Sequence, residues 1–240
     1  MGDVELHREL GRASAGESEG GMRRLARLAV SSMRAAGAGA VATGRWLADT
    51  AIDVAPHIPI RDRATLEAHY EGLRGADLAG ELVRNAARAT ATIGAAMGAL
   101  AGAEELSPPT WLALPVELII ETLAVAAVEM KLVAELHEVY GRTVPGHGAD
   151  RGLVLARAWA ERRGVTAETL VRGQGVGDLL GRGARQEVTR LVRRRLMRRT
   201  LRNTSSLAPF LLGAIAGAEL NRRATMSLGD AVVRDLAARR

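Results

Sequence analysis

The chain has 240 residues and a net charge of +6, and Lys131 is its only lysine, so nearly all of its positive charge is arginine. This length is enough for one large domain with its own core. Cysteine is absent, which excludes disulfides, thiol catalysis and thiolate metal sites and favours the cytoplasm.

The first 21 residues are acidic and rich in glycine and serine. This composition predicts a disordered or frayed N-terminal arm over 1–21, in which Gly16, Gly20 and Gly21 end any helix begun by Val4–Leu10. It does not match a secretory signal peptide. Met22 is an alternative start, but the basic and apolar stretch after it is interrupted by Arg27 and Arg34, which argues against secretion. We expect residues 22–240 to form one helical domain.

Apolar residues at helical spacing predict a helix over 22–55, which ends at a proline-containing connector. Gly37, Gly39 and Gly44 lie in the middle of this helix and weaken it, because glycine lowers helix propensity. The same spacing predicts a second helical region over 62–102.

The end of that region is rich in small residues. Glycine recurs every four positions at Gly94, Gly98 and Gly102, with alanines between them. Small residues at this spacing let another helix approach closely, in a membrane or in a protein core. Two hypotheses follow: insertion into a membrane as a hairpin, or tight packing onto the helix predicted next, and we favour packing.

The longest apolar run, 111–141, predicts the central helix of the domain. Its charged residues form a stripe about 80° wide, since each residue of a helix advances by about 100°; the stripe is Glu117, Glu121, Lys131 and Glu135. We expect Lys131 and Glu135 to pair one turn apart and the glutamates to meet arginines of neighbouring helices.

A membrane span is the alternative for this run. Nine large apolar side chains between Glu117 and Glu135 favour insertion by about 0.3–0.6 kcal/mol each, whereas each interior charge opposes it by about 2.5–3.5 kcal/mol. The charges of Glu121, Glu129 and Lys131 outweigh the apolar gain. A buried helix with one charged stripe is therefore the better prediction.

Two further helices are predicted over 150–163 and 166–172. The glycines of 173–177 superficially suggest a phosphate-binding loop. No Gly-Lys-Ser/Thr follows them and no strand precedes them, so we interpret this segment as a linker.

The segment 182–202 is the most basic part of the chain. Its apolar residues form a seam, and arginines crowd the rest of the surface: Arg193, Arg194, Arg195, Arg198, Arg199 and Arg202. An apolar run containing Gly213 and Gly217 follows over 207–220, and a last amphipathic helix is predicted over 227–238. No stretch alternates as a strand does, so we expect an all-α fold: a single bundle-like domain with a central apolar helix and Gly/Ala-rich helical hairpins.

Catalytic and cofactor motifs are missing from the sequence. Glu117 and Glu121 lie one turn apart, as in di-iron helical bundles, but those sites also need Glu-x-x-His motifs, which do not occur here. The five histidines have no partner at ligand spacing, and no G-x-S-x-G motif is present. We therefore predict no catalytic residues, no metal site and no cofactor, and a protein that is not an enzyme.

The arginine-rich segment has three possible roles. It could bind nucleic-acid phosphates, bind anionic lipid head groups, or be a solvated face without a ligand. Single-stranded nucleic acid is disfavoured because aromatic residues, on which bases stack, are only 2% of the chain. We favour a membrane surface, because the apolar run over 207–220 follows the basic segment directly.

Three local patterns resemble the bacterial EcsC family, over about residues 60–235. They are the Gly/Ala-rich segment 90–102 leading through a proline turn into the long apolar helix, the end of that helix in LVAELHEVYG (132–141), and the segment APFLLGAIAGAELN (208–221). The chain departs from the family at Ala113-Leu114-Pro115, where members commonly carry an acidic residue.

The resemblance implies a helical fold and association with a membrane, and it implies no particular reaction. We expect a cytoplasmic protein at the inner face of the cell membrane. It would attach to anionic lipid or to a membrane protein such as a transporter. The alternative is a soluble helical module that binds nucleic acid or a protein partner.

Overall fold

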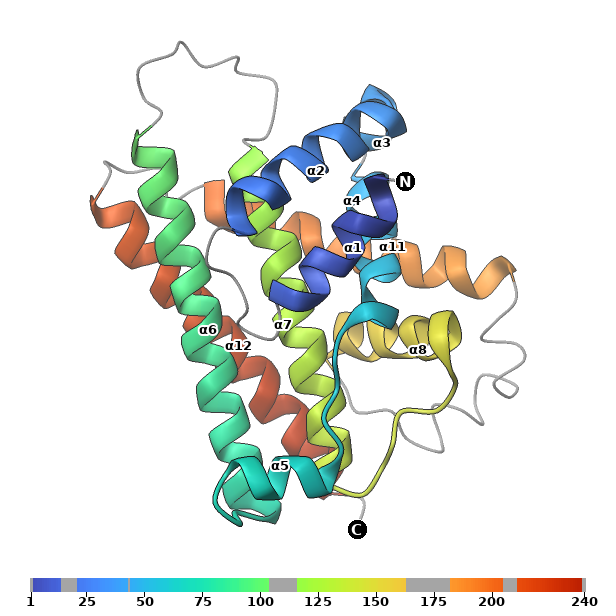
Figure 1. The fold of residues 1–240 in the computed structure, drawn as a ribbon, viewed down its shortest axis with the longest axis vertical. Helices are drawn as coiled ribbons and strands as arrows, with labels where there is room; N and C mark the ends of the chain where they lie inside the picture. Colours follow the sequence, from blue (N-terminus) through green and yellow to red (C-terminus); the bar gives the residue numbers. More distant parts are fainter. Residues whose placement is uncertain are drawn as a thin grey trace.

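The computed structural model describes residues 2–13, 21–42, 44–103, 116–162, 182–204 and 211–238, and these contain α-helices and no strand (Figure 1). The predicted all-α fold is confirmed. The helices are α1 (Gly2–Ala13), α2 (Gly21–Ala36), α3 (Ala38–Ala42), α4 (Arg45–Val54), a 3-10 turn η1 (Ala55–His57), α5 (Arg63–His69), α6 (Gly75–Ala103), α7 (Val116–Val139), α8 (Gly148–Glu161), α11 (Arg182–Thr204) and α12 (Leu211–Ala237).

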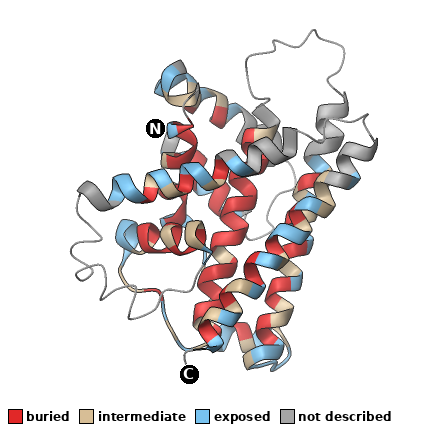
Figure 2. Ribbon diagram, turned by 180° about the vertical axis from the view of Figure 1, so that it is seen from behind, coloured by how far each residue is buried: buried red, intermediate tan, exposed pale blue. Residues whose placement is uncertain are grey.

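Helix α7 is the centre of the molecule, as the apolar run over 111–141 predicts. Residues 119–130 and 132–137 are all buried, and Figure 2 shows them as a buried column through the fold. The helices that pack against α7 are α1, α2, α4, α5, α6, α8, α11 and α12. Among the residues that the structure describes, no helix has the length and apolar character needed to cross a membrane.

The N-terminal region differs from its prediction as a disordered arm. Residues Gly2–Ala13 form helix α1, and Leu6 and Leu10 are almost completely buried in the core. Local composition predicts disorder here, but two leucines one turn apart reach a surface formed by distant elements, and their burial stabilises the helix. Residues 14–20 lie outside the described part of the chain.

The single helix predicted over 22–55 is divided into α2, α3 and α4. The divisions fall at two of the glycines that weaken this region, because Gly37 and Gly44 adopt positive φ angles of 84° and 67°. Glycine takes such angles at little cost, and they end a right-handed helix. The region predicted over 62–102 is likewise divided, into α5 and α6.

Helix α12 is longer than predicted. The apolar run and the last amphipathic helix form one continuous helix, Leu211–Ala237. Ion pairs within the helix bridge the expected break, because Glu219 bonds both Arg222 and Arg223, three and four residues further on. The helix predicted over 166–172 and the glycine-rich segment 173–177 lie outside the described residues.

Candidate functional site

The candidate site is the outward face of α11. Val188, Val192 and Leu196 recur every four residues and are at most 2% exposed, so they hold one side of this helix against the core. The helix packs on α4, α7 and α8. Figure 2 shows it crossing in front of α7 with an exposed outer face.

Exposed arginines cover that outer face. Arg190, Arg193, Arg194 and Arg198 are all exposed, and within the described part of the chain no ion pair joins any of them to a carboxylate. We call these four side chains the α11 arginine face. The side chains of Arg199 and Arg202, which belong to the same basic segment, lie outside what the structure describes.

Arg195 differs from its neighbours, because its side chain points inward and is only 17% exposed. Its Nη2 donates to Glu129 Oε2 at 3.0 Å, and its guanidinium carbon lies 4.3 Å from the centre of the Trp159 ring. A second bond from Nη1 reaches the carbonyl of Trp159. Arg195 therefore fastens α11 to the core and does not belong to the α11 arginine face.

Glu129 is the residue on which this attachment depends. It is fully buried, and its Oε2 also accepts from Trp159 Nε1 at 2.8 Å. Its Oε1 accepts from Thr225 Oγ1 at 3.0 Å, and Thr225 in turn lies 2.9 Å from Thr90 Oγ1. The carboxylate of Glu129 on α7 thus bonds side chains of α8, α11 and α12. Through the contact between Thr225 and Thr90, the same network also connects α12 to α6. A buried charge is stable only with such partners.

In the sequence, Glu129 stands out only as one of three charges that oppose membrane insertion of the apolar run. An isolated acid on the apolar side of a buried helix must find partners, and this is the one signal that could have singled it out. Its partners Trp159, Arg195 and Thr225 could not have been identified from the sequence, because they lie 30, 66 and 96 residues away.

The predicted charged stripe on α7 is satisfied within the protein where the structure describes it. Lys131 Nζ lies 3.0 Å from Glu135 Oε1, which confirms the expected pair. Arg61 forms a two-pronged bond to Glu135, with both N–O distances at 2.8 Å, and this bond raises the pKa of the guanidinium. Glu121 accepts from Asn221 Nδ2 at 2.6 Å. The side chain of Glu117 is not described.

The predicted close-packing glycines act between α6 and α12. A Cβ added to Gly94 would lie 2.6 Å from Asn221 Nδ2 and 3.0 Å from Gly217 O. The two helices run side by side in Figure 1. Gly94 therefore meets α12, whereas we expected the small-residue segment to meet the helix over 111–141. Contacts of Gly98, Gly102 and Gly213 are not described.

The histidines do not assemble into a metal site within the described residues, where no group of three or more His, Asp or Glu side chains is placed to hold an ion. His137 is fully buried on α7, and its Nδ1 lies 2.6 Å from the carbonyl oxygen of Val133. Burial lowers the pKa of this imidazole below its ordinary value.

This lowered pKa predicts a loss of stability in mild acid. The unfolded chain takes up a proton near the ordinary histidine pKa of about 6.5, whereas the folded chain resists it. The contribution of His137 is therefore fully present above that pH and is lost as pH falls below it. We expect the free energy of unfolding to fall more steeply from pH 7.5 to 5.5 in the wild type than in His137→Gln, as measured by urea denaturation. Equal slopes would show that His137 is not the titrating group.

Comparisons with protein-family models, with curated proteins and with solved structures gave no significant match to this chain. The resemblance to the EcsC family therefore stays a prediction that rests on the three sequence motifs.

Proposed function

We propose that this protein attaches to anionic membrane surfaces, or to the membrane-facing side of a membrane protein, through the α11 arginine face. The observation that carries the proposal is the set of four exposed arginines on one helix face, none of them paired with a carboxylate among the described residues. Guanidinium groups bind phosphate oxygens with two parallel hydrogen bonds, and they match the head groups of anionic lipids.

The geometry of α11 supports a surface role. Its apolar seam is buried in the core, so the helix is already folded and already presents its arginines outward. The bonds of Arg195 to Glu129 and Trp159 fix the rotation of α11 about its helix axis. Because α11 is already ordered, binding costs little conformational entropy. With about 1 kcal/mol for each basic residue near an anionic surface, four arginines contribute about 4 kcal/mol at low salt.

Charge reversal on α11 tests the proposal. In flotation with vesicles containing anionic lipid, the wild type should float at low salt and lose binding at high salt, because exposed charges are screened. The variant Arg193→Glu/Arg194→Glu/Arg198→Glu should not float under either condition. The three substitutions remove about 3 kcal/mol of electrostatic attraction to the vesicle surface and add repulsion between the new glutamates and the anionic lipid.

A matched control carries the same change in net charge elsewhere. Arg63, Arg74 and Arg84 are exposed arginines of α5, α6 and the turn between them. Reversing these three should leave most of the flotation intact. If both variants lose flotation equally, vesicle binding depends on net charge alone, and its assignment to α11 is overturned. Binding to duplex DNA without any vesicle binding would favour the nucleic-acid alternative instead.

A further inference from the structure

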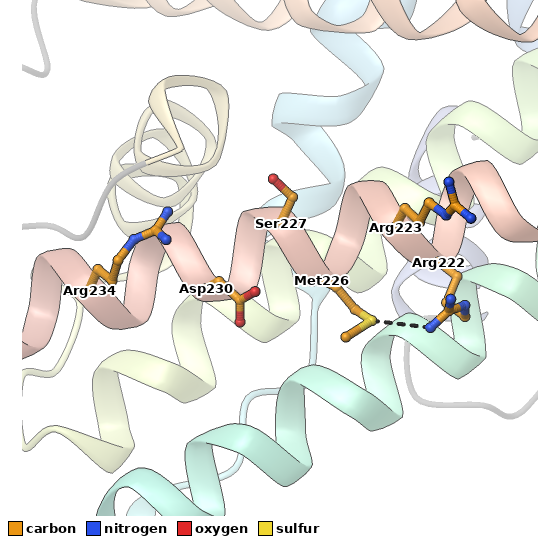
Figure 3. Close-up of a pocket in the computed structure, with 6 residues that line it drawn as sticks. All are labelled: Arg222, Arg223, Met226, Ser227, Asp230 and Arg234. Carbon is orange, nitrogen blue, oxygen red and sulfur yellow. Dashed lines mark hydrogen bonds between the residues drawn. The ribbon is translucent and has the colours of Figure 1, made fainter.

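A second basic feature lies on α12, apart from the α11 arginine face. An open groove of about 390 Å³ runs along this helix (Figure 3), and its lining residues are Arg222, Arg223, Met226, Ser227, Asp230 and Arg234. Its volume is within the range of small-molecule sites. The groove therefore has room for a ligand of head-group size.

The hydroxyl of Ser227 in the groove can donate a hydrogen bond to a ligand. Arg162, at the end of α8, donates from Nη2 to Ser227 Oγ at 2.7 Å and so reaches the groove from a second element. Because Ser227 Oγ accepts this bond, its own proton is directed elsewhere. Within the described residues that proton has no acceptor. The pair thus offers an incoming anion both a guanidinium and an O–H donor.

The other charges of the groove divide into two groups. Arg222 and Arg223 both bond Glu219, at 2.7 and 2.5 Å, and these bonds lower the pKa of Glu219 to about 2, so it stays ionised and neutralises one of them. Asp230 and Arg234 lie one turn apart, where such residues usually pair. Here neither forms an ion pair with another described residue.

We infer that this groove binds a phosphoester that carries a primary amine. Arg162, Arg234 and the hydroxyl of Ser227 would hold the phosphate oxygens, and Asp230 would hold the ammonium group. Three guanidinium groups and one carboxylate line the groove, while Arg162 and Glu219 bond lining residues, so the groove favours an anion. Asp230 makes one positive charge at the other end of the ligand favourable. Met226 supplies an apolar contact for the carbons between the two ends.

The test uses O-phosphoethanolamine as the probe and the full chain as the protein. Titration followed by NMR of arginine Nε–Hε resonances should show saturable binding to the wild type. Arg234→Gln should weaken it about tenfold, since the variant loses a charge-assisted hydrogen bond to the phosphate. Asp230→Asn should reduce the preference for O-phosphoethanolamine over glycerol phosphate about two- to fivefold, the worth of an exposed ion pair.

The control is Arg84→Gln, which removes an exposed arginine of α6 and should bind like the wild type. All of these positions are exposed or half-buried, so the variants should keep the wild-type backbone spectrum. Equal affinity of Arg234→Gln and wild type would overturn the site. An unchanged ligand preference in Asp230→Asn would overturn the requirement for an amine.

A second arm distinguishes a lipid head group from a soluble ligand and is independent of the proposed function. It uses the α11 charge-reversal variant, which lacks the proposed membrane contact. If the groove takes lipid, this variant should still favour vesicles of phosphatidylethanolamine over phosphatidylcholine, and adding Arg234→Gln should abolish the preference. If the ligand is soluble, NMR binding should persist without any vesicle preference. Failure of the α11 flotation test would leave both results unaffected.

Discussion

Replacing Glu129 with alanine should destabilise the protein by about 3–5 kcal/mol, the cost of leaving one partner of a buried ion pair uncompensated. The carboxylate is fully buried and bonds Trp159, Arg195 and Thr225. Its removal takes the Glu129 counter-charge away from the Arg195 guanidinium and removes the acceptor of the Trp159 indole N–H. Urea denaturation followed by circular dichroism at 222 nm measures the loss.

The matched control for Glu129→Ala is Glu187→Ala. Glu187 is also half of an arginine–glutamate pair, but it is 60% exposed and lies 3.8 Å from Arg157. Exposed pairs contribute about 0–1 kcal/mol, so this variant should unfold close to the wild type. The double variant Glu129→Leu/Arg195→Met should recover part of the lost stability, because it removes both buried charges. Equal effects at Glu129 and Glu187 would contradict the role of the buried pair.

Replacing Gly94 with alanine should cost about 2–3 kcal/mol, at the upper end of what overpacking a core costs. The new Cβ would lie 3.0 Å from the backbone oxygen of Gly217, which cannot move without shifting α12. It would also lie 2.6 Å from Asn221 Nδ2, and displacing that amide would break its bond to Glu121. The clash outweighs the gain in helix propensity, and thermal unfolding measures the result.

Gly80→Ala is the internal control on the same helix. A Cβ there would meet only Nη1 of the exposed Arg84 side chain, at the ordinary contact distance of 3.4 Å. Alanine is more favourable than glycine in a helix by about 0.5–1 kcal/mol, so Gly80→Ala should raise the stability by about that amount. A stabilising effect at Gly94 would show that α6 and α12 are not in close contact there.

The sequence alone was sufficient for the fold class and for the central helix. An apolar run interrupted by few charges predicts a buried helix at 111–141, and the structure places buried α7 at Val116–Val139. The pairing of Lys131 with Glu135 was also predictable, because the two residues lie one helical turn apart. The glycines at 37 and 44 marked the helix breaks, although the sequence did not show that they would divide the region into separate helices.

The outcome at α1 depended on the tertiary structure. Composition and periodicity are local properties, and locally the first 21 residues are acidic and glycine-rich. Leu6 and Leu10 form a helix because distant parts of the chain bury them, and no local pattern contains that information.

The arginines of 182–202 also separate what the local sequence determines from what the tertiary structure decides, here within one helix. The sequence determined that this segment is a basic helix with an apolar seam, since that depends on residue type and spacing alone. Helical spacing also places Arg195 on the seam side, three residues after Val192 and seven after Val188, but only the tertiary structure decided that its partner there is Glu129. A buried carboxylate 66 residues away made the difference, because its charge requires a partner and Arg195 is the arginine that lies within reach.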